Sequence, residues 1–224
     1  MFEKMQSLPL LQGLTLKEFS ELIVNLKLDF QQYDEHEVIV NQGDRCSALT
    51  YIIDGTFEVE YHDERTAFIV SEQSDDCPHL IEAYNLFGVK RSYERTYSFV
   101  TKGHTFTISR DFFLKRLMGH ELIRSNYINY LCNNLRKAKD TYKDDIPTEI
   151  DRKIVKAIAN HCLFKGGQKN VRIKMNDLAQ VIDETRLNVS GVLNQWKDQG
   201  LIELRRYGFT IKDFDKLTTI CKNK

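Results

Sequence analysis

A segment of six residues, 185–190, combines side chains that can form paired hydrogen bonds. Arg186 carries a planar fork of N–H donors, Asn188 carries both an amide donor and an amide acceptor, and Ser190 has a hydroxyl group that can do either. Such groups suit the donor and acceptor pattern of base-pair edges in the major groove of DNA. They interrupt an apolar stripe at helical spacing, formed by Leu187, Val189, Val192, Leu193 and Trp196. The pattern predicts a helix that buries one face and offers other faces for contact.

The neighbouring residues predict the elements that hold this helix. Asn176 is expected to cap a shorter helix with an apolar face, Asp183-Glu184 to form the turn, and Thr185 to cap the second helix. Gly200 stands where a helix stop is expected. A strand, a basic turn at residues 205–208 and another strand then predict a hairpin. This order is that of a winged helix-turn-helix, and the alternative is a helical hairpin and a β-hairpin with no nucleic-acid role.

Charge separates the chain into two parts. The 224 residues contain 32 Lys+Arg and 32 Asp+Glu, but residues 151–224 hold 15 basic against 8 acidic side chains, a net charge of +7. Residues 1–150 therefore carry −7. Such asymmetry indicates that the basic part binds a polyanion. The five widely spaced cysteines do not predict a disulfide framework, and no apolar run approaches the roughly 20 residues of a membrane span, so we expect a cytoplasmic protein without membrane contact.

The pattern before the basic part changes from period two to helical. Residues 29–109 contain several short alternating segments with turns at Gln42-Gly43-Asp44, Asp54-Gly55 and Lys102-Gly103-His104, which predicts an antiparallel sandwich or barrel. Residues 80–88 are expected to form a short helix inserted among these strands.

Two helical segments follow, at residues 111–118 and from about 120 to 142. Along the longer one an apolar seam favours a self-associating coiled coil over packing on the β domain, and consists of Tyr127, Leu131, Leu135, Ala138 and Tyr142. Residues 143–148 are expected to be a hinge. We therefore predict a β sensor domain at 1–118, a dimerisation helix and hinge at 119–146, and a DNA-binding domain at 147–224.

The order of elements and several local motifs resemble the CRP/FNR family of bacterial transcription regulators. The motifs are Asn41-Gln42-Gly43-Asp44 with Tyr51-Ile52-Ile53-Asp54-Gly55, and Asp177-Leu178-Ala179 through Leu201-Ile202. The Leu-Phe-Gly at 86–88 and the Thr-Arg-Leu-Asn-Val-Ser at 185–190 resemble the branch found in the Bacteroidetes. The resemblance implies an α+β chain: an N-terminal antiparallel β-roll, cupin-like or jelly roll in type, then a long dimerisation helix and a C-terminal winged helix-turn-helix. It also implies a homodimer that binds a double-stranded DNA operator, with RNA polymerase as a further partner.

The resemblance assigns roles within the predicted reading head. Arg186 falls on the family's guanine-reading arginine, and Asn188, Ser190 and Thr185 are the neighbouring candidates. Leu187 stands where an acid often sits and Gly191 where a second arginine often sits, so we expect an operator unlike the usual family sequence. Phosphate contacts are expected from Lys174, Arg205 and Arg206.

The resemblance also directs attention to an effector site in the β domain. Family members that bind cyclic nucleotides carry a Gly-Glu-Leu run for the ribose and an Arg-Ser pair for the phosphate. Here Glu82 lacks the preceding glycine, while Arg95-Thr96 matches the second motif. Cyclic AMP therefore has an incomplete site, and Arg95 pairing with a carboxylate is the alternative. The effector is left unknown.

Other chemistries have weaker signals. The cysteines are too far apart in sequence to predict an iron-sulfur cluster. Cys77-Pro78-His79 offers a thiolate and an imidazole for haem, but a loop cysteine is the favoured interpretation. The sequence lacks the nucleophile-elbow, phosphate-loop and zinc-protease motifs, so an enzyme is not expected. The rival to a transcription regulator is a ligand-binding protein-interaction module that does not bind DNA.

Overall fold

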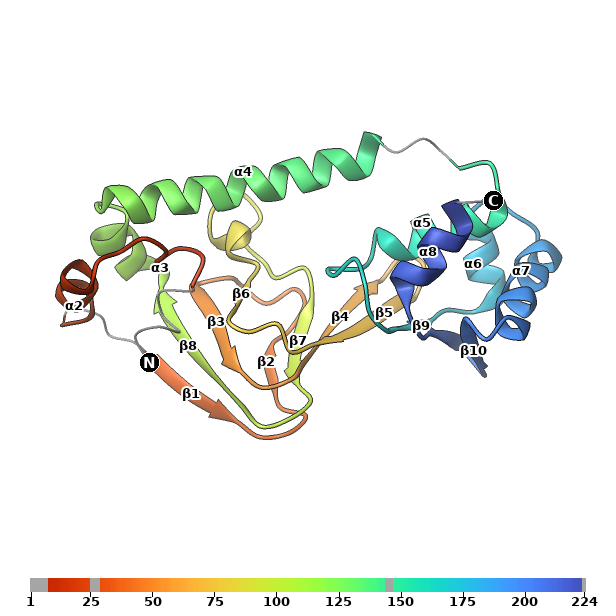
Figure 1. The fold of residues 1–224 in the computed structure, drawn as a ribbon, viewed down its shortest axis with the longest axis horizontal. Coiled ribbons are helices and arrows are strands. Elements are labelled where there is room, and N and C mark those ends of the chain that lie inside the picture. Colours follow the sequence, from red (N-terminus) through yellow and green to blue (C-terminus); the bar gives the residue numbers. More distant parts are fainter. Residues whose placement is uncertain (1–7, 25–28, 144–146, 223–224) are drawn as a thin grey trace. The chain divides into compact units, whose positions relative to one another are not determined.

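A computed structural model describes residues 8–24, 29–143 and 147–222, with the side chains of 19, 23, 24 and 140–143 outside that description (Figure 1). These residues form two compact units. The first takes the described residues of 1–57, 75–94 and 98–143, and the second takes those of 58–74, 95–97 and 144–224. Each unit is described separately below.

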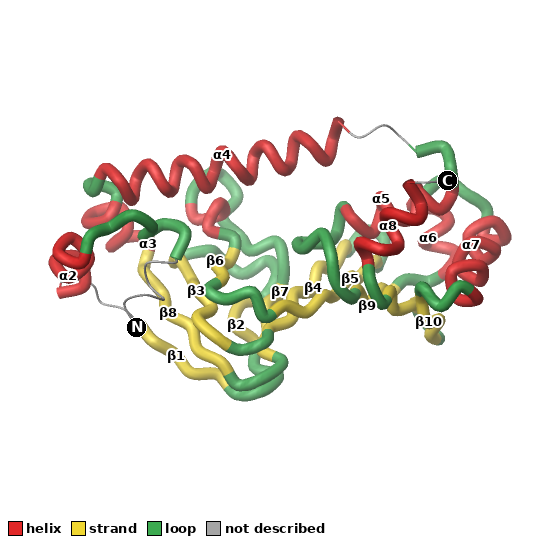
Figure 2. Tube along the Cα trace, in the orientation of Figure 1, coloured by secondary structure: helices red, strands yellow, loops and turns green. Residues whose placement is uncertain are grey.

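The first unit contains an antiparallel sheet and the described helices that precede residue 144. The sheet has the strand order β1-β8-β3-β6, and its strands are drawn as yellow tubes in Figure 2. The elements of this unit are α2 (Leu16–Val24), β1 (Asp29–Tyr33), β2 (Val38–Val40), β3 (Ala48–Asp54), β6 (His79–Ile81), the 3₁₀ helix η1 (Ala83–Leu86), β8 (Gly103–Ser109), α3 (Arg110–Phe112), the π-helical turn η2 (Phe113–Leu117) and α4 (Glu121–Lys143). Strand β7 (Thr96–Phe99) begins in the second unit and ends in the first.

Buried cross-strand pairs hold this sheet together. Tyr51 on β3 lies opposite Phe106 on β8, and their rings stack with centroids 4.7 Å apart. Both side chains are almost completely buried. Opposed aromatic pairs of this kind stabilise antiparallel sheets. The turn after β3 depends on Gly55, which has φ 96° and where a Cβ atom would lie 2.9 Å from the Cα of Gly103.

Local hydrogen bonds fix two features of the first unit. Thr15 and Glu18 form a capping box at the start of α2, with the Thr15 amide donating to the Glu18 carboxylate at 2.9 Å and the Glu18 amide donating to the Thr15 hydroxyl at 3.3 Å. The turn at 42–44 is closed by the Asp44 amide, which donates to the Asn41 carbonyl oxygen at 3.2 Å.

The predicted helix at residues 80–88 is wrong in its first part. Leu80 and Ile81 belong to β6 and pair with Tyr51 and Thr50 of β3, and only residues 83–86 form a short 3₁₀ helix. The reason is that a remote strand satisfies the backbone of residues 79–81, which local sequence does not reveal. Strand β1 was not predicted either, and it too depends on a remote partner, β8.

Helix α4 is one continuous helix, close to the predicted limits (Figure 2). The predicted seam is only partly exposed. Tyr127 is 2% exposed, and its hydroxyl donates to the Ala83 carbonyl oxygen at 2.9 Å, so it packs within its own unit. Leu135 is 58% exposed and Ile128, one residue after Tyr127, is 50% exposed. The side chain of Tyr142 lies outside the described residues, as does most of the predicted hinge.

The second unit contains all elements after residue 147 together with a hairpin from earlier in the chain. Its strands have the order β10-β11-β9-β5-β4. The elements are β4 (Phe57–Asp63, of which residues 58–63 belong here), β5 (Phe68–Ser74), α5 (Ile150–Ala159), β9 (Lys169–Arg172), α6 (Met175–Val181), α7 (Arg186–Asp198), β10 (Ile202–Arg205), β11 (Gly208–Ile211) and α8 (Phe214–Lys222).

Strand β5 pairs antiparallel with β9, so the β4–β5 hairpin extends the C-terminal sheet. Ser71 lies opposite Asn170 and Glu72 opposite Lys169. The Glu72 carboxylate accepts from the Lys169 ammonium and from the Leu163 and Phe164 amides, and both charged side chains are buried. The pairing was not predicted from the sequence. The predicted limits 1–118, 119–146 and 147–224 stay a prediction.

None of the helices in the described part of the chain combines the length and apolarity that a bilayer crossing requires. The architecture is the predicted α+β class: an antiparallel β part at the N-terminal side, a long helix, and a helix-turn-helix followed by a hairpin.

Candidate nucleic-acid interface

The turn between α6 and α7 has the predicted geometry. Asp183 has φ 53°, the left-handed conformation expected of it, and the Glu184 amide donates to the Ala179 carbonyl oxygen at 2.9 Å. The Thr185 hydroxyl accepts from the Asn188 amide at 3.2 Å and so caps α7 as expected. The predicted cap of α6 is wrong. Its cap is Lys174, whose extended backbone precedes Met175 and whose side chain makes no capping hydrogen bond.

An ion pair fastens this turn to α5. The Lys153 ammonium lies 2.6 Å from the Glu184 carboxylate, and the Asn188 side-chain amide donates to the same carboxylate at 3.3 Å. The hydrogen bond from Lys153, followed by that from Asn188, lowers the pKa of Glu184 below its ordinary value. The start of α7 is thereby held in place against α5 by the ion pair between Lys153 and Glu184.

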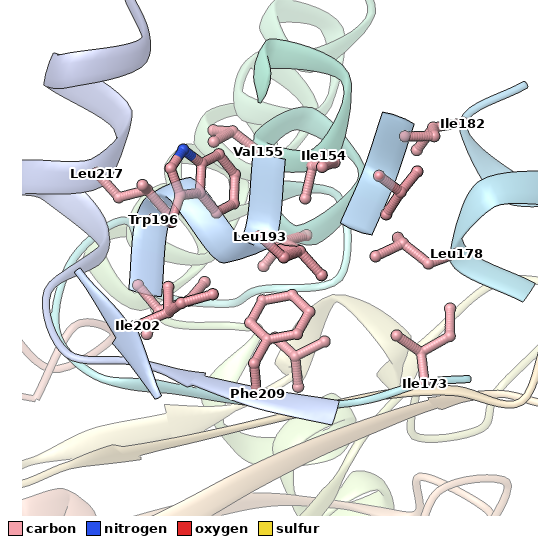
Figure 3. Packing of buried hydrophobic residues seen from close by; sticks show 14 of the residues in the cluster. Ile154, Val155, Ile173, Leu178, Ile182, Leu193, Trp196, Ile202, Phe209 and Leu217 are labelled. Atoms are coloured by element: carbon pink, nitrogen blue, oxygen red, sulfur yellow. The ribbon is translucent and has the colours of Figure 1, made fainter. Parts of the chain in front are cut away.

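The inner face of α7 is packed into the core of the second unit. Val189, Leu193 and Trp196 are at most 1% exposed. In Figure 3, Trp196 and Leu193 lie among side chains of α5, including Ile154, and of the C-terminal hairpin, including Ile202. This packing therefore fixes the rotation of α7 about its axis and determines which of its faces point away from the cluster.

The predicted base-reading residues lie on two flanks of the exposed part of α7. Arg186 and Ser190 are four residues apart and share one flank, since an α-helix has 3.6 residues per turn. Asn188 lies on the other flank. Arg186 and Asn188 are exposed, whereas Ser190 is half-buried and its hydroxyl accepts from the Asn194 amide at 3.4 Å. The structure thus brings Arg186 and Ser190 together and separates them from Asn188.

The predicted phosphate-contacting residues are exposed at the edges of the same unit. Lys174 precedes α6, Arg205 ends β10, and Arg206 lies in the tip of the hairpin with its guanidinium 5.1 Å from the Tyr207 ring centroid. Gly208 is required after this tip because a Cβ there would overlap the carbonyl oxygen of Val171.

Ion pairing separates these cations from others in the unit. Lys153, Lys169, Arg172 and Lys212 are paired with Glu184, Glu72, Glu60 and Glu203, respectively. Lys174, Arg186, Arg205 and Arg206 form no ion pair with any described residue. The positive charge of the predicted contact residues is therefore available to an anion, as is that of other exposed lysines of the unit such as Lys165, Lys197 and Lys216.

Leu187 has an exposed side chain that was not predicted from the sequence. It was counted with the apolar stripe of α7, yet its side chain is 81% exposed. The signal in the sequence was its position: it is six residues before Leu193 and therefore falls outside the i, i+3, i+4 pattern of the buried face.

The predicted effector residues belong to different units. Glu82 is in the first, with φ 31° and a buried carboxylate that accepts from the Glu94 amide at 2.6 Å and the Asn85 side chain at 3.2 Å. Its carboxylate thus organises its own loop. Arg95 and Thr96 are assigned to the second unit, where the Arg95 guanidinium lies 5.6 Å from the Tyr61 ring centroid.

The Cys77-Pro78-His79 segment makes contacts within the protein. The Cys77 thiol donates to the Gly55 carbonyl oxygen at 3.5 Å, and the His79 ring lies 5.1 Å from that of Phe57. Burial lowers the pKa of His79 to about 4. Among the described residues, no group of three or more His, Cys, Asp and Glu side chains is arranged to hold a metal ion.

Comparison with known proteins agrees with this arrangement. Residues 153–220 match the model of the Crp-like helix-turn-helix domain. The chain is similar in fold to the Thermus thermophilus catabolite activator protein, with a TM-score of 0.50 and 17% identity, covering 94% of this chain and 98% of that one. It is also similar to a Eubacterium rectale protein whose name places it in the Crp/Fnr family of transcriptional regulators, with a TM-score of 0.53 and 17% identity, covering 96% and 98%.

No curated protein is similar enough in sequence to match this chain. At 17% identity, the structural likenesses establish the fold. The chain therefore has the fold of the CRP/FNR transcription regulators, with a Crp-like helix-turn-helix domain at residues 153–220.

Proposed function

We propose that this chain is a homodimeric, sequence-specific DNA-binding transcription regulator of the CRP/FNR type that acts in the cytoplasm. The observation that carries the proposal is a group of exposed cations around α7 and the hairpin tip that form no ion pair with a described residue: Lys174, Arg186, Arg205 and Arg206. They lie on a Crp-like helix-turn-helix whose second helix is fixed by its buried face. A helix held in this way can enter the major groove with a fixed set of side chains facing the base pairs.

The N-terminal end of α7 adds to the attraction for DNA. Its first turn contains no acidic residue, and Thr185 and Arg186 stand at its start. The free amides and the dipole of a helix N-terminus favour a phosphate oxygen. In this proposal Arg186 reads a base with Ser190 beside it, Asn188 reads from the other flank, and Thr185, Lys174, Arg205 and Arg206 position the domain on the backbone.

In this proposal, self-association through α4 supplies the second reading helix, which binds the second half-site of the operator. Ile128, Leu131, Leu135 and Ala138 are spaced three, four and three residues apart, which is the heptad spacing of a two-stranded coiled coil. The first three are exposed or half-buried apolar side chains in the described structure. A two-fold dimer would place two reading helices on a pseudo-palindromic operator.

A small-molecule or redox signal in the N-terminal part is proposed to control DNA binding. Glu82, Arg95 and Thr96 are the proposed effector-contacting residues, and the buried Glu82 carboxylate would have to exchange its present amide donors for a ligand hydroxyl. The Bacteroidetes-type branch is part of the same proposal and depends on residues 185–190. RNA polymerase is the further partner proposed.

The test is the salt dependence of binding to duplex DNA. An operator enriched from a random duplex pool is titrated with the protein at about 50 and 200 mM salt, and affinity is expected to fall by orders of magnitude because phosphate contacts release counterions. The double variant Arg205→Ala/Arg206→Ala is expected to have a smaller salt slope. A protein that enriches no sequence and binds DNA without salt dependence would favour the protein-interaction module instead.

A further inference from the structure

One leucine on α7 lies where an apolar side chain contributes nothing to the core. Leu187 is 81% exposed, whereas Val189 and Trp196 on the same helix are completely buried. At 3.6 residues per turn, Leu187 lies about 150° around the helix from the mean direction of the buried Val189, Leu193 and Trp196. Its side chain therefore points away from the protein along the centre of the exposed face.

The surroundings of Leu187 leave room for a close approach. Gly191, one turn further along the same face, is exposed and has no side chain, and even an added Cβ would have open space around it within 4 Å. Leu187 is also flanked in sequence by Arg186 and Asn188, which carry the hydrogen-bonding groups. The side chain near the centre of the exposed face is thus apolar, and its two neighbours in sequence are polar.

An isolated exposed leucine loses nothing by contact with a small apolar group. It has no donor or acceptor, so it cannot take part in the hydrogen-bond pattern of base edges. The thymine 5-methyl group is the apolar feature that the major groove presents. Removing even one methyl-sized surface from water is worth about a fourfold change in affinity.

Resting on the proposed function, we infer that Leu187 is a specificity-determining residue that packs against the 5-methyl group of one thymine in each half-site. Arg186 and Asn188 supply hydrogen bonds on either side, while Leu187 selects thymine over cytosine at the base pair between them. Gly191 allows the helix to lie close enough to the groove floor for this contact.

The test removes the methyl group from the DNA instead of from the protein. The operator enriched by the wild-type chain is resynthesised with deoxyuridine replacing each thymine in turn, which deletes only the 5-methyl group. One position per half-site is expected to lose about fourfold in affinity for the wild-type chain. The variant Leu187→Ala is expected to bind the thymine and deoxyuridine operators equally. Because Leu187 is exposed, this variant should retain the wild-type melting temperature.

A second leucine serves as the matched control. Leu204 lies in the hairpin strand β10 and is 36% exposed. Leu204→Ala should keep the wild-type sensitivity to deoxyuridine, since the inferred contact is specific to α7. Conversely, Leu187→Glu is expected to change the preferred base at the same position from thymine to cytosine, because a carboxylate accepts from the cytosine amino group.

The outcomes distinguish this inference from the function on which it rests. A wild-type chain that binds its enriched operator with strong salt dependence but tolerates every deoxyuridine overturns the leucine contact and leaves the regulator proposal standing. Equal loss at deoxyuridine for wild type and Leu187→Ala also overturns it, because the methyl group would then be read by another residue. A wild-type chain that enriches no sequence overturns both, and leaves the exposed leucine as a protein-docking residue.

Discussion

Arg186 is the residue on which base reading depends most strongly in the proposed interface. It is exposed, forms no ion pair with a described residue, and lies on the same flank of α7 as Ser190. Arg186→Ala is expected to cost about 1–3 kcal/mol of binding free energy and to relax the preference at one base pair, measured by competition with single-base operator variants. Lys174→Ala is the control: as a phosphate contact it should weaken binding to all sequences equally. An Arg186→Ala variant that loses affinity evenly would contradict the base-reading role.

His79 gives the first unit a dependence on pH. Burial lowers its pKa to about 4 in the folded chain, whereas an unfolded histidine titrates near 6.5. Between these two values the unfolded chain binds a proton that the folded chain does not, so the free energy of unfolding decreases as the pH falls through this window. From pH 7 to pH 5 the expected loss is about 1–2 kcal/mol.

Urea unfolding followed by circular dichroism at both pH values measures this loss. Carboxylates also titrate toward pH 5, so the informative quantity is the difference from the variant His79→Gln, which cannot be protonated. The variant should show a smaller loss than wild type over the same interval. An equal loss in both proteins would mean that burial does not keep His79 neutral in the folded chain.

Residue-level predictions succeeded where the signal is local. The left-handed backbone of Asp183 and the cap of Thr185 follow from what those side chains can do within a few positions of themselves. Asn176 failed as a cap because the cap lies two residues earlier, at Lys174, which provides an extended backbone but no side-chain acceptor. The exposure of Leu187 required the helix to be placed against its core. The roles of these residues on DNA stay predictions.

At the scale of the element, replacing two glycines of α7 and its C-terminal end by alanine is expected to change the stability of the second unit in opposite directions. Gly200 ends α7 with φ 71°, a conformation that costs a residue with a side chain about 1 kcal/mol or more. Gly191 lies inside α7, where alanine is favoured by about 0.5–1 kcal/mol, and its added Cβ would meet nothing within 4 Å. Gly200→Ala should therefore destabilise the unit and Gly191→Ala should stabilise it.

Tryptophan fluorescence during urea unfolding measures both changes. Trp196 is the single tryptophan of the chain and is buried in the second unit, so its signal follows this unit. An unchanged or higher midpoint for Gly200→Ala would contradict the need for a left-handed residue at this position, and a lower midpoint for Gly191→Ala would contradict the expected gain in helix propensity.

The strands were predictable to the extent that they alternate on their own. Period-two segments and glycine turns located β3, β4 and β8, but β1 and β6 were missed because their sequences alternate weakly and their partners lie far away in the chain. Helix α8 was also missed. The pairing of β5 with β9 joins residues about a hundred positions apart, and no local pattern indicates such a pairing. What sequence periodicity cannot supply is the identity of a remote hydrogen-bonding partner.

At the scale of the whole chain, a buried ion pair within the second unit joins the β4–β5 hairpin to strand β9, which comes about a hundred residues later in the sequence. Glu72 on β5 and Lys169 on β9 are 2% and 1% exposed. Removing one member of such a pair leaves a buried charge and is expected to cost about 3 kcal/mol. Glu72→Gln keeps an acceptor for the Leu163 and Phe164 amides, so its effect isolates the lost charge.

A double-mutant cycle tests the pair with the same Trp196 signal. Lys169→Met and Glu72→Gln should each lower the unfolding midpoint, and the double variant should cost less than the sum of the two single variants because it leaves no unpaired charge. Additive costs would show that the two groups act independently.

Self-association of the whole molecule is expected to depend on one stripe of α4. Ile128 and Leu135 are 50% and 58% exposed, seven residues apart, and lie on the same side of the helix. Ile128→Glu/Leu135→Glu would bring like charges together at a two-fold seam and should convert a dimer into a monomer in sedimentation at micromolar concentration. The matched control Asn133→Glu adds a charge to the opposite, exposed side of α4 and should leave the dimer intact.

The same variants connect assembly to DNA reading. A monomer holds a single reading helix, so the seam variant should bind a half-site about as well as wild type but lose the additional affinity for the full operator that two linked half-sites provide. The control variant should keep that additional affinity. A seam variant that remains dimeric would move the interface away from α4, and a wild-type chain that sediments as a monomer would remove the dimer from the proposal while leaving the reading of a half-site by α7 unaffected.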